Sequence, residues 1–173
     1  CLVGSEMCIR DRSIDMLLNM TVDDSIKFFR KYNQTKIVNK LLPLQSVGLG
    51  YVSLGQSSNT LSGGEAQRIK LASFIGKGDQ IDKTFFIFDE PTTGLHFHDV
   101  KKLLNTFDKL IRMGHSILVI EHNLDMISCA DHIIDLGPEG GDKGGMIIAE
   151  GSPEDIIKNK ISYTGKYLKK KIA

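Results

Sequence analysis

Two apolar runs separated by a long amphipathic stretch constrain the fold of this chain more than any other feature. The runs TFFIF (84–88) and HSILVI (115–120) are rich in aromatic and β-branched residues, which is typical of strands buried on both faces of a sheet. Residues 97–114 between them have helical periodicity and end at a glycine. A strand, a crossover helix and a second strand predict neighbouring parallel strands, and therefore an α/β fold with a parallel-rich sheet flanked by helices.

Further elements are predicted on both sides of this unit. Residues 132–136 and 146–151 are expected to be two more strands that pair antiparallel across the turn PEGGDKGG. Upstream, TVDDSIKFFRKY predicts a helix with Thr21 as its N-cap and Asp24 three residues further on. The segment before residue 61 therefore looks like an appended helical subdomain.

Polar side chains follow both central strands at the point where each strand ends. Asp89 and Glu90 follow the first strand, and Glu121 and His122 follow the second. The carboxyl ends of parallel strands meet at one edge of the sheet, where α/β proteins bind ligands. There Asp89 could hold Mg²⁺ through water, Glu90 could activate an attacking water, and His122 could donate to a phosphate oxygen. A bare D-E-P can also be a solvated acidic turn, but the second strand's polar end favours the functional interpretation.

The stretch TLSGGEAQRIKLAS places two glycines at the start of a predicted helix, where glycine is a poor choice for stability. The exposed backbone N–H groups of a helix N-terminus bind anions, and glycines allow a close approach. Ser62 can add its hydroxyl. Together with Gly63 and Gly64, it predicts a binding position for the terminal phosphate of a nucleotide.

A nucleotide site also needs a phosphate-binding loop of the form G-x-x-x-x-G-K-[ST], and this sequence contains none. The nearest match is GYVSLGQS (50–57), where Gln56 stands in place of the lysine and no strand precedes the loop. We interpret this match as accidental. The chain is therefore expected to be unable to hold a nucleotide alone.

Composition narrows the remaining classes of function. The 22 basic and 21 acidic side chains give a net charge of +1, which favours neither nucleic acid nor membrane binding. No apolar run approaches the roughly 18 residues of a membrane helix. Cys1, Cys8 and Cys129 form no C-x-x-C pair, so we expect no zinc ligands in this chain. The lysine run in KYLKKKIA is expected to be a solvated face rather than a DNA contact.

Several stretches resemble known ATPases. LSGGE resembles the signature of ABC-type ATPases, FFIFDE their Walker B strand and IEH their switch-histidine region. Longer stretches are similar to the C-terminal end of the UvrA family, the damage-recognition ATPases of bacterial nucleotide excision repair. They are LGQSSNTLSGGEAQRIKLA, DEPTTGLHFHD, VIEHNLDMI and DLGPEGGDKGG, with NMTVDDSIKFF upstream. The resemblance covers residues 13–173 and implies the C-terminal part of an ABC-ATPase nucleotide-binding domain, with a helical signature subdomain on its N-terminal side.

The resemblance implies a role for each matching residue. The signature loop, which closes over ATP held by the Walker A loop of another nucleotide-binding domain, would be Ser62, Gly63, Gly64 and Glu65. Asp89 would be the Mg²⁺-side carboxylate, Glu90 the catalytic glutamate and His122 the γ-phosphate sensor. The D-loop would be Thr93, Gly94, Leu95 and His96, where His96 replaces the aspartate usual in transporters. The chain would thus hold parts of two composite ATP sites and complete neither, so the parent protein would be an ATP hydrolase and the isolated chain inactive.

The resemblance also implies cofactors, partners and a location. The cofactors would be ATP and Mg²⁺, with zinc only in the full-length family member. The partners would be damaged double-stranded DNA, a second copy in a homodimer, the UvrB helicase subunit and the missing N-terminal half with its Walker A segment. The protein would be cytoplasmic, with no membrane contact.

The sequence predicts three segments with different origins or roles, and it leaves two alternative functions open. Residues 1–12 resemble a translated sequencing adapter and are expected to be disordered; the alternative is a disordered native N-terminus. Residues 13–60 would be the helical lead-in and residues 61–173 the ABC-ATPase half. The function could instead be that of an ABC-transporter ATPase subunit, although EAQR, TTGLH and PEGG are unusual there, or that of a non-enzymatic dimerisation module.

Overall fold

The computed structural model describes residues 8–9, 12–76, 82–139 and 144–172. The chain divides into two compact units, Cys1–Val119 and Ile120–Ala173, with the boundary at the end of strand β4. Each unit is described by itself below.

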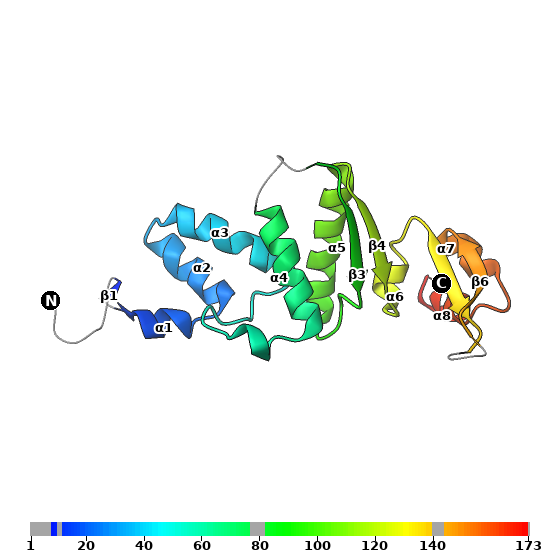
Figure 1. The fold of residues 1–173 in the computed structure, drawn as a ribbon, viewed down its shortest axis with the longest axis horizontal. Helices are drawn as coiled ribbons and strands as arrows, with labels where there is room; N and C mark the ends of the chain where they lie inside the picture. Colours follow the sequence, from blue (N-terminus) through cyan, green and yellow to red (C-terminus); the bar gives the residue numbers. More distant parts are fainter. Residues whose placement is uncertain (1–7, 10–11, 77–81, 140–143, 173) are drawn as a thin grey trace. The chain divides into compact units, whose positions relative to one another are not determined.

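The described part of the first unit combines helices with a short sheet (Figure 1). Its helices are α1 (Ile14–Leu18), α2 (Val22–Lys31), α3 (Thr35–Ser46), the 3₁₀ helix η1 (Ser58–Thr60), α4 (Gly63–Ile75) and α5 (Phe97–Arg112). Its strands are β1 (Cys8–Ile9), β2 (Arg12–Ser13), β3 (Phe85–Asp89) and β4 (Ser116–Ile120).

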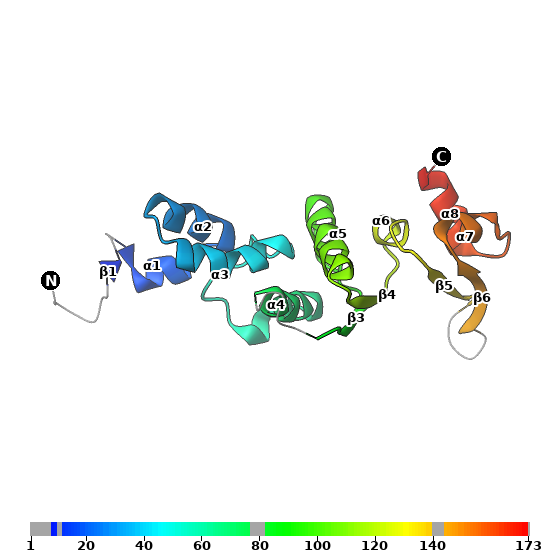
Figure 2. The ribbon, with the colours of Figure 1, turned by 90° about the horizontal axis from the view of Figure 1, so that it is seen from above.

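The helical part of this unit is a hairpin of α2 and α3, which lie side by side in both views (Figure 2). Thr21 caps α2, because its Oγ1 accepts a hydrogen bond from the backbone N–H of Asp24 at 3.1 Å. This confirms the predicted cap. Apolar side chains on the facing sides form a buried cluster of Leu17, Val22, Ile26, Phe29, Val38 and Leu41. α3 also packs on α4, so the lead-in helices and the signature helix share one compact unit.

The α/β part of the unit is the predicted strand–helix–strand arrangement. β3 and β4 are neighbours in a two-stranded parallel sheet, and the backbone N–H of Ser116 donates to the Thr84 carbonyl at 3.0 Å. α5 connects the strands and buries one face against them; Leu103 is fully buried, and the Phe107 ring lies 4.9 Å from that of Phe88. The βαβ prediction is therefore confirmed.

The prediction that both strands are buried on both faces is wrong for the described structure. The side chains on the face away from α5 are largely exposed: Phe85 by 61%, Ile87 by 62% and Leu118 by 43%. Successive side chains of a strand point to opposite faces, so α5 covers only every second residue. Among the described residues of this unit, no element covers the other face.

The expected adapter segment, residues 1–12, is only partly described. Cys8–Ile9 pairs antiparallel with Arg12–Ser13, so these residues form a small ladder where disorder was expected. The other residues of the segment lie outside the described residues. Its origin as adapter sequence stays a prediction.

The described part of the second unit is a β-hairpin with three helices. It contains α6 (Leu124–Ile127), β5 (Ile133–Gly137), β6 (Met146–Gly151), α7 (Pro153–Lys158) and α8 (Tyr163–Ile172). β5 and β6 pair antiparallel, as predicted. The buried carboxylate of Asp135 on β5 accepts hydrogen bonds from the Ser162 hydroxyl at 2.5 Å and the Thr164 hydroxyl at 2.8 Å. These bonds fix the start of α8 on the hairpin.

Close packing between α7 and α8 makes Gly165 sensitive to substitution. A Cβ at Gly165 would meet the Ile156 carbonyl, whose carbon would be only 3.0 Å away. We expect Gly165→Ala to lower the free energy of unfolding by about 1–3 kcal/mol, measured by urea denaturation followed by circular dichroism. Gly63→Ala is the matched control, because a Cβ there would have nothing within 4 Å. Equal midpoints for the two variants would contradict this account of the packing.

Candidate functional site

The predicted signature loop, Ser62 to Glu65, begins α4 with a complete capping box. The Ser62 Oγ accepts a hydrogen bond from the Glu65 backbone N–H at 3.3 Å, and the Glu65 Oε2 accepts one from the Ser62 backbone N–H at 2.8 Å. The predicted helix is confirmed, and it ends at Ile75. Gly63 is exposed, and a Cβ there would meet nothing within 4 Å. The first turn of α4 is therefore open to a ligand at Gly63, while Ser62 is occupied by Glu65.

Tyr51 supports this cap from a distant part of the sequence, and the sequence analysis did not identify it. Its hydroxyl donates to the Glu65 Oε1 at 2.5 Å. This hydrogen bond, followed by that from the Ser62 backbone, lowers the pKa of Glu65. Burial, followed by the hydrogen bond to Glu65, raises the pKa of Tyr51. The ionised Glu65 and the neutral Tyr51 therefore stabilise each other at neutral pH.

This pair predicts a pH-dependent contribution to stability. A carboxyl group with a lowered pKa stabilises the fold above its unfolded pKa, and this contribution is lost as the pH falls through the folded pKa. We expect Tyr51→Phe to lower the free energy of unfolding by about 1 kcal/mol or less at pH 7. The difference from wild type should shrink as the pH falls below about 4.3, the ordinary pKa of glutamic acid. Urea denaturation between pH 3 and pH 7 measures it, with Tyr167→Phe as the control; a pH-independent difference would contradict the role of Glu65.

The acidic edge of the sheet lies in a tight turn after β3. Asp89 is the last residue of β3, and Glu90 has a backbone φ of +46°, in the left-handed region that non-glycine residues rarely adopt. The backbone N–H of Thr93 donates to the Glu90 carbonyl at 3.1 Å, and the Thr93 hydroxyl donates to the Glu90 carboxylate at 3.3 Å. This turn holds the Glu90 side chain exposed beyond the end of the strand.

The predicted D-loop residues continue from the same turn. Gly94 has a φ of +75°, which allows the chain to reverse, and the Leu95 N–H donates to the Thr92 carbonyl at 3.0 Å. His96 is the N-cap of α5 and uses its backbone carbonyl rather than its ring. The structure thus brings these residues together with Glu90. Their role as a D-loop stays a prediction.

The signature helix and the acidic edge are in direct contact within the first unit. A Cβ on Gly64 would meet the Thr93 carbonyl oxygen at 3.3 Å and the Arg68 Nη1 at 3.1 Å, so only glycine fits here without a shift. Arg68 donates from Nη1 to the Pro91 carbonyl at 2.7 Å and to the Thr93 carbonyl at 3.3 Å. The sequence analysis missed Arg68, because a helix interior gives no local signal for a contact 23 residues away.

His122 belongs to the second compact unit, so its predicted pairing with Glu90 stays a prediction. It lies in the segment between β4 and α6, and its side chain is exposed. The Glu121 Oε2 accepts hydrogen bonds from the backbone N–H groups of His122 and Asn123, both at 3.0 Å. The Asn123 side chain then caps α6. These bonds fix the backbone at His122.

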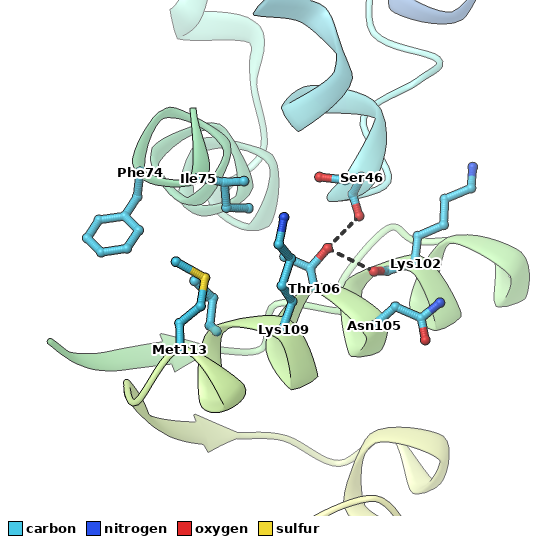
Figure 3. Close-up of a pocket in the computed structure, with 9 residues that line it drawn as sticks. Ser46, Phe74, Ile75, Lys102, Asn105, Thr106, Lys109 and Met113 are labelled. Carbon is cyan, nitrogen blue, oxygen red and sulfur yellow. Dashed lines mark hydrogen bonds between the residues drawn. The ribbon is translucent and has the colours of Figure 1, made fainter. Parts of the chain in front are cut away.

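A pocket of about 330 Å³ between α3, α4 and α5 contains none of the predicted site residues (Figure 3). The Thr106 hydroxyl on its wall donates to the carbonyls of Ser46 and Lys102, so these polar groups already have hydrogen-bond partners within the protein.

The match to a phosphate-binding loop at residues 50–57 does not have the structure of such a loop. These residues form turns with an isolated bridge from Ser53 to Thr21, not a strand–loop–helix, which agrees with an accidental match. In the described ranges, no three His, Cys, Asp or Glu side chains gather as a metal site. No helix there is long and apolar enough to span a membrane.

The chain is similar to curated proteins over nearly its whole length. It is 59% identical to UvrABC system protein A of Clostridium acetobutylicum and 58% identical to that of Clostridium perfringens, over 165 residues in each case. It is 53% identical to UvrABC system protein A of Aquifex aeolicus over 165 residues. Each alignment covers 95% of this chain, but only 17% of the two Clostridium proteins and 18% of the Aquifex protein. The chain therefore spans about a sixth of the length of these relatives.

Solved structures agree with the sequence similarity. The crystal structure of UvrA2 from Deinococcus radiodurans matches with a TM-score of 0.78 and 37% identity, covering 94% of this chain and 20% of that one. A bacterial Atm1-family ABC exporter with ATP bound matches with a TM-score of 0.52 and 22% identity, covering 91% of this chain and 27% of that one. The exporter shares the fold alone. No family model matches the chain. The predicted α/β, ABC-ATPase class of fold is confirmed.

Proposed function

We propose that this chain, which belongs to the family of UvrABC system protein A, supplies parts of two ATP sites in a DNA-damage-recognition ATPase. One observation carries the proposal. The open, glycine-led N-terminus of α4 is joined to the turn that presents Glu90 by the hydrogen bonds of Arg68, one turn further along α4, to the carbonyls of Pro91 and Thr93. The helix end that would bind an anion and the carboxylate that would activate water thus belong to one compact unit, and each would face its own nucleotide.

The signature loop would bind the γ-phosphate of an ATP held by another nucleotide-binding domain. The N–H groups at Gly63 and Gly64 point toward the helix N-terminus, where the helix dipole favours negative charge. The Ser62 hydroxyl would have to leave Glu65 to donate to the phosphate. Glu65 would remain paired with Tyr51 and keep the cap in place.

The acidic edge would serve a second ATP, bound to a Walker A loop elsewhere in the longer protein. Asp89 would hold Mg²⁺, which usually binds through one or two carboxylates together with the phosphates of its nucleotide. When bound, Mg²⁺ would neutralise charge on those phosphates. Glu90 would accept the proton of the attacking water, and its exposure beyond β3 leaves it accessible. His122 would donate to a γ-phosphate oxygen.

The full-length protein would extend this activity to repair. We propose damaged double-stranded DNA, a second copy of the protein and the UvrB helicase subunit as its partners, and the cytoplasm as its location. A transporter ATPase is the weaker candidate, because the likeness to the exporter is one of fold at 22% identity. A purely structural dimerisation module would need no carboxylate held at the end of β3.

The stoichiometry of trapped nucleotide tests the assignment to two different sites. In the protein of full family length that contains these residues, hydrolysis with vanadate should trap two nucleotides per chain. Ser62→Arg, which blocks the signature loop, and Glu90→Gln should each trap one. The double variant should trap none, because each substitution disables a different site.

Two outcomes would contradict the proposal. If the double variant traps as much as either single variant, then Ser62 and Glu90 serve the same site. If neither substitution changes the trapped amount, the residues have no part in hydrolysis. Glu154→Gln is the control, because Glu154 is exposed on α7.

A further inference from the structure

Arg68 is a completely buried cation in the middle of α4, one turn after Gly64. Arginine is almost never fully buried unless its donors are paired. Here only Nη1 is used, for the carbonyls of Pro91 at 2.7 Å and Thr93 at 3.3 Å. Nε and Nη2 are buried without a hydrogen-bond acceptor among the described residues. The positive charge of Arg68 also contributes to the lowered pKa of Glu65 in the cap of the same helix. Arg68 therefore interacts both with the start of α4 and with the turn that follows β3.

The two neighbouring side chains of α4 bind the backbone on either side of Glu90. Gln67 donates from Nε2 to the Asp89 carbonyl at 3.2 Å, and Arg68 donates to the Pro91 carbonyl. These are the carbonyls immediately before and after Glu90. Glu90 itself has the rare φ of +46°. Such a conformation costs about 1–3 kcal/mol and persists only where the surroundings hold it.

We propose that Arg68, assisted by Gln67, is a positioning residue that holds Glu90 in its left-handed conformation and couples it to the signature loop. This inference rests on the function proposed above. Arg68 is buried beneath the turn, so it acts through the backbone of Glu90 and not on a nucleotide. Because a Cβ on Gly64 would lie only 3.3 Å from the Thr93 carbonyl oxygen, the start of α4 is close to the same turn, and a movement of the helix start would reach it. The occupancy of one ATP site would thus be transmitted to the carboxylate of the other.

The kinetic test uses Arg68→Met and Arg68→Lys in the protein of full family length. Methionine keeps much of the volume and removes the donors, and lysine keeps one charged donor. We expect Arg68→Met to lower kcat for ATP hydrolysis at the site served by Glu90 about 10- to 100-fold, because a displacement of about 1 Å at a catalytic group has an effect of this size. The rate is measured in the Ser62→Arg background, in which the other site is blocked. The dissociation constant for ATP should stay within about twofold of wild type. Arg68→Lys should recover part of kcat. Lys70→Met, which removes an exposed charge from the same helix, should change neither constant.

A second readout follows the turn directly in the 173-residue chain. The Thr93 N–H donates to the Glu90 carbonyl, so its hydrogen exchange reports whether the turn is held. Arg68→Met should accelerate exchange at Thr93 about tenfold or more, and Lys70→Met should leave it unchanged. If Arg68→Met does not fold, Gln67→Leu is measured instead and should give the same two effects at smaller size.

The outcomes separate this inference from the proposed function. Loss of hydrolysis in Glu90→Gln with a normal kcat in Arg68→Met overturns the inference alone. Normal hydrolysis at this site in Glu90→Gln, again with the other site blocked, overturns the proposed function. In the Glu90→Gln background, Arg68→Met should cause no further loss, because it acts through Glu90. An additional, multiplicative loss there, or a rise in KM at constant kcat, would mean that Arg68 acts by another route.

Discussion

Replacing Glu90 by glutamine is expected to lower ATP hydrolysis at its site by at least about 100-fold, since a positioned general base contributes about 10²–10⁴ in rate. Glutamine keeps the size of the side chain but cannot accept the proton of the attacking water. ATP affinity should change little, because Glu90 carries no binding role. Single-turnover hydrolysis and equilibrium nucleotide binding, both in the protein of full family length, measure the two effects.

Glu90→Gly separates the carboxylate from the backbone conformation that presents it. Glycine adopts a positive φ without strain, so this variant should be at least as stable as wild type while hydrolysis is lost. Glu154→Gln should leave both hydrolysis and stability unchanged. Normal single-turnover rates in Glu90→Gln would remove Glu90 from the chemistry and leave the turn as a structural feature.

The parts of the structure that the sequence predicts correctly depend on local signals. The cap at Thr21 and the helix after Gly63 are set by residues three or four positions apart. The order of β3, α5 and β4 follows from hydrophobic periodicity and from the rule that crossover connections join parallel strands. The end of β3 is also predictable, because Pro91 follows closely and has no backbone N–H to donate to a sheet.

The parts that the sequence does not predict depend on contacts between distant residues. Tyr51 reaches Glu65 across 14 positions, and Arg68 reaches Pro91 across 23. Neither residue type is unusual in its local context. The left-handed backbone of Glu90 is equally invisible, since glutamate has no preference for it. These three features hold the site together, and tertiary structure alone reveals them.

The burial of β3 and β4 shows a second limit on what can be predicted from the sequence. The apolar run FFIF is continuous, and such a run is typical of a strand covered on both faces. Yet Phe85 and Ile87 are exposed here, on the face opposite α5. A sequence pattern records the surroundings of a strand in the whole protein, whereas this chain spans about a sixth of its relatives. The expected and the observed burial of these strands therefore differ on the face opposite α5.

This exposed face should make the 173-residue chain associate with itself. Phe85, Ile87 and Leu118 present large apolar side chains on adjacent strands, and contiguous patches of this kind mark interaction surfaces or sites of aggregation. Burying a large apolar side chain contributes about 1.5–3 kcal/mol, and each 1.4 kcal/mol is tenfold in affinity. The double variant Phe85→Thr/Ile87→Thr should therefore weaken self-association about 100-fold or more. Threonine retains the preference for a strand.

Sedimentation velocity over a range of concentrations measures this association, and binding of a fluorescent apolar dye reports the patch itself. Ile161→Thr is the matched control, because Ile161 is 68% exposed but lies outside the sheet of β3 and β4. It should leave both readouts unchanged. Two outcomes would show that the open face of β3 and β4 is not the self-association interface. One is a chain that is monomeric at every concentration, and the other is a double variant that associates like wild type. Loss of association in the double variant alone would assign the apolar run to a sheet face that the longer protein buries.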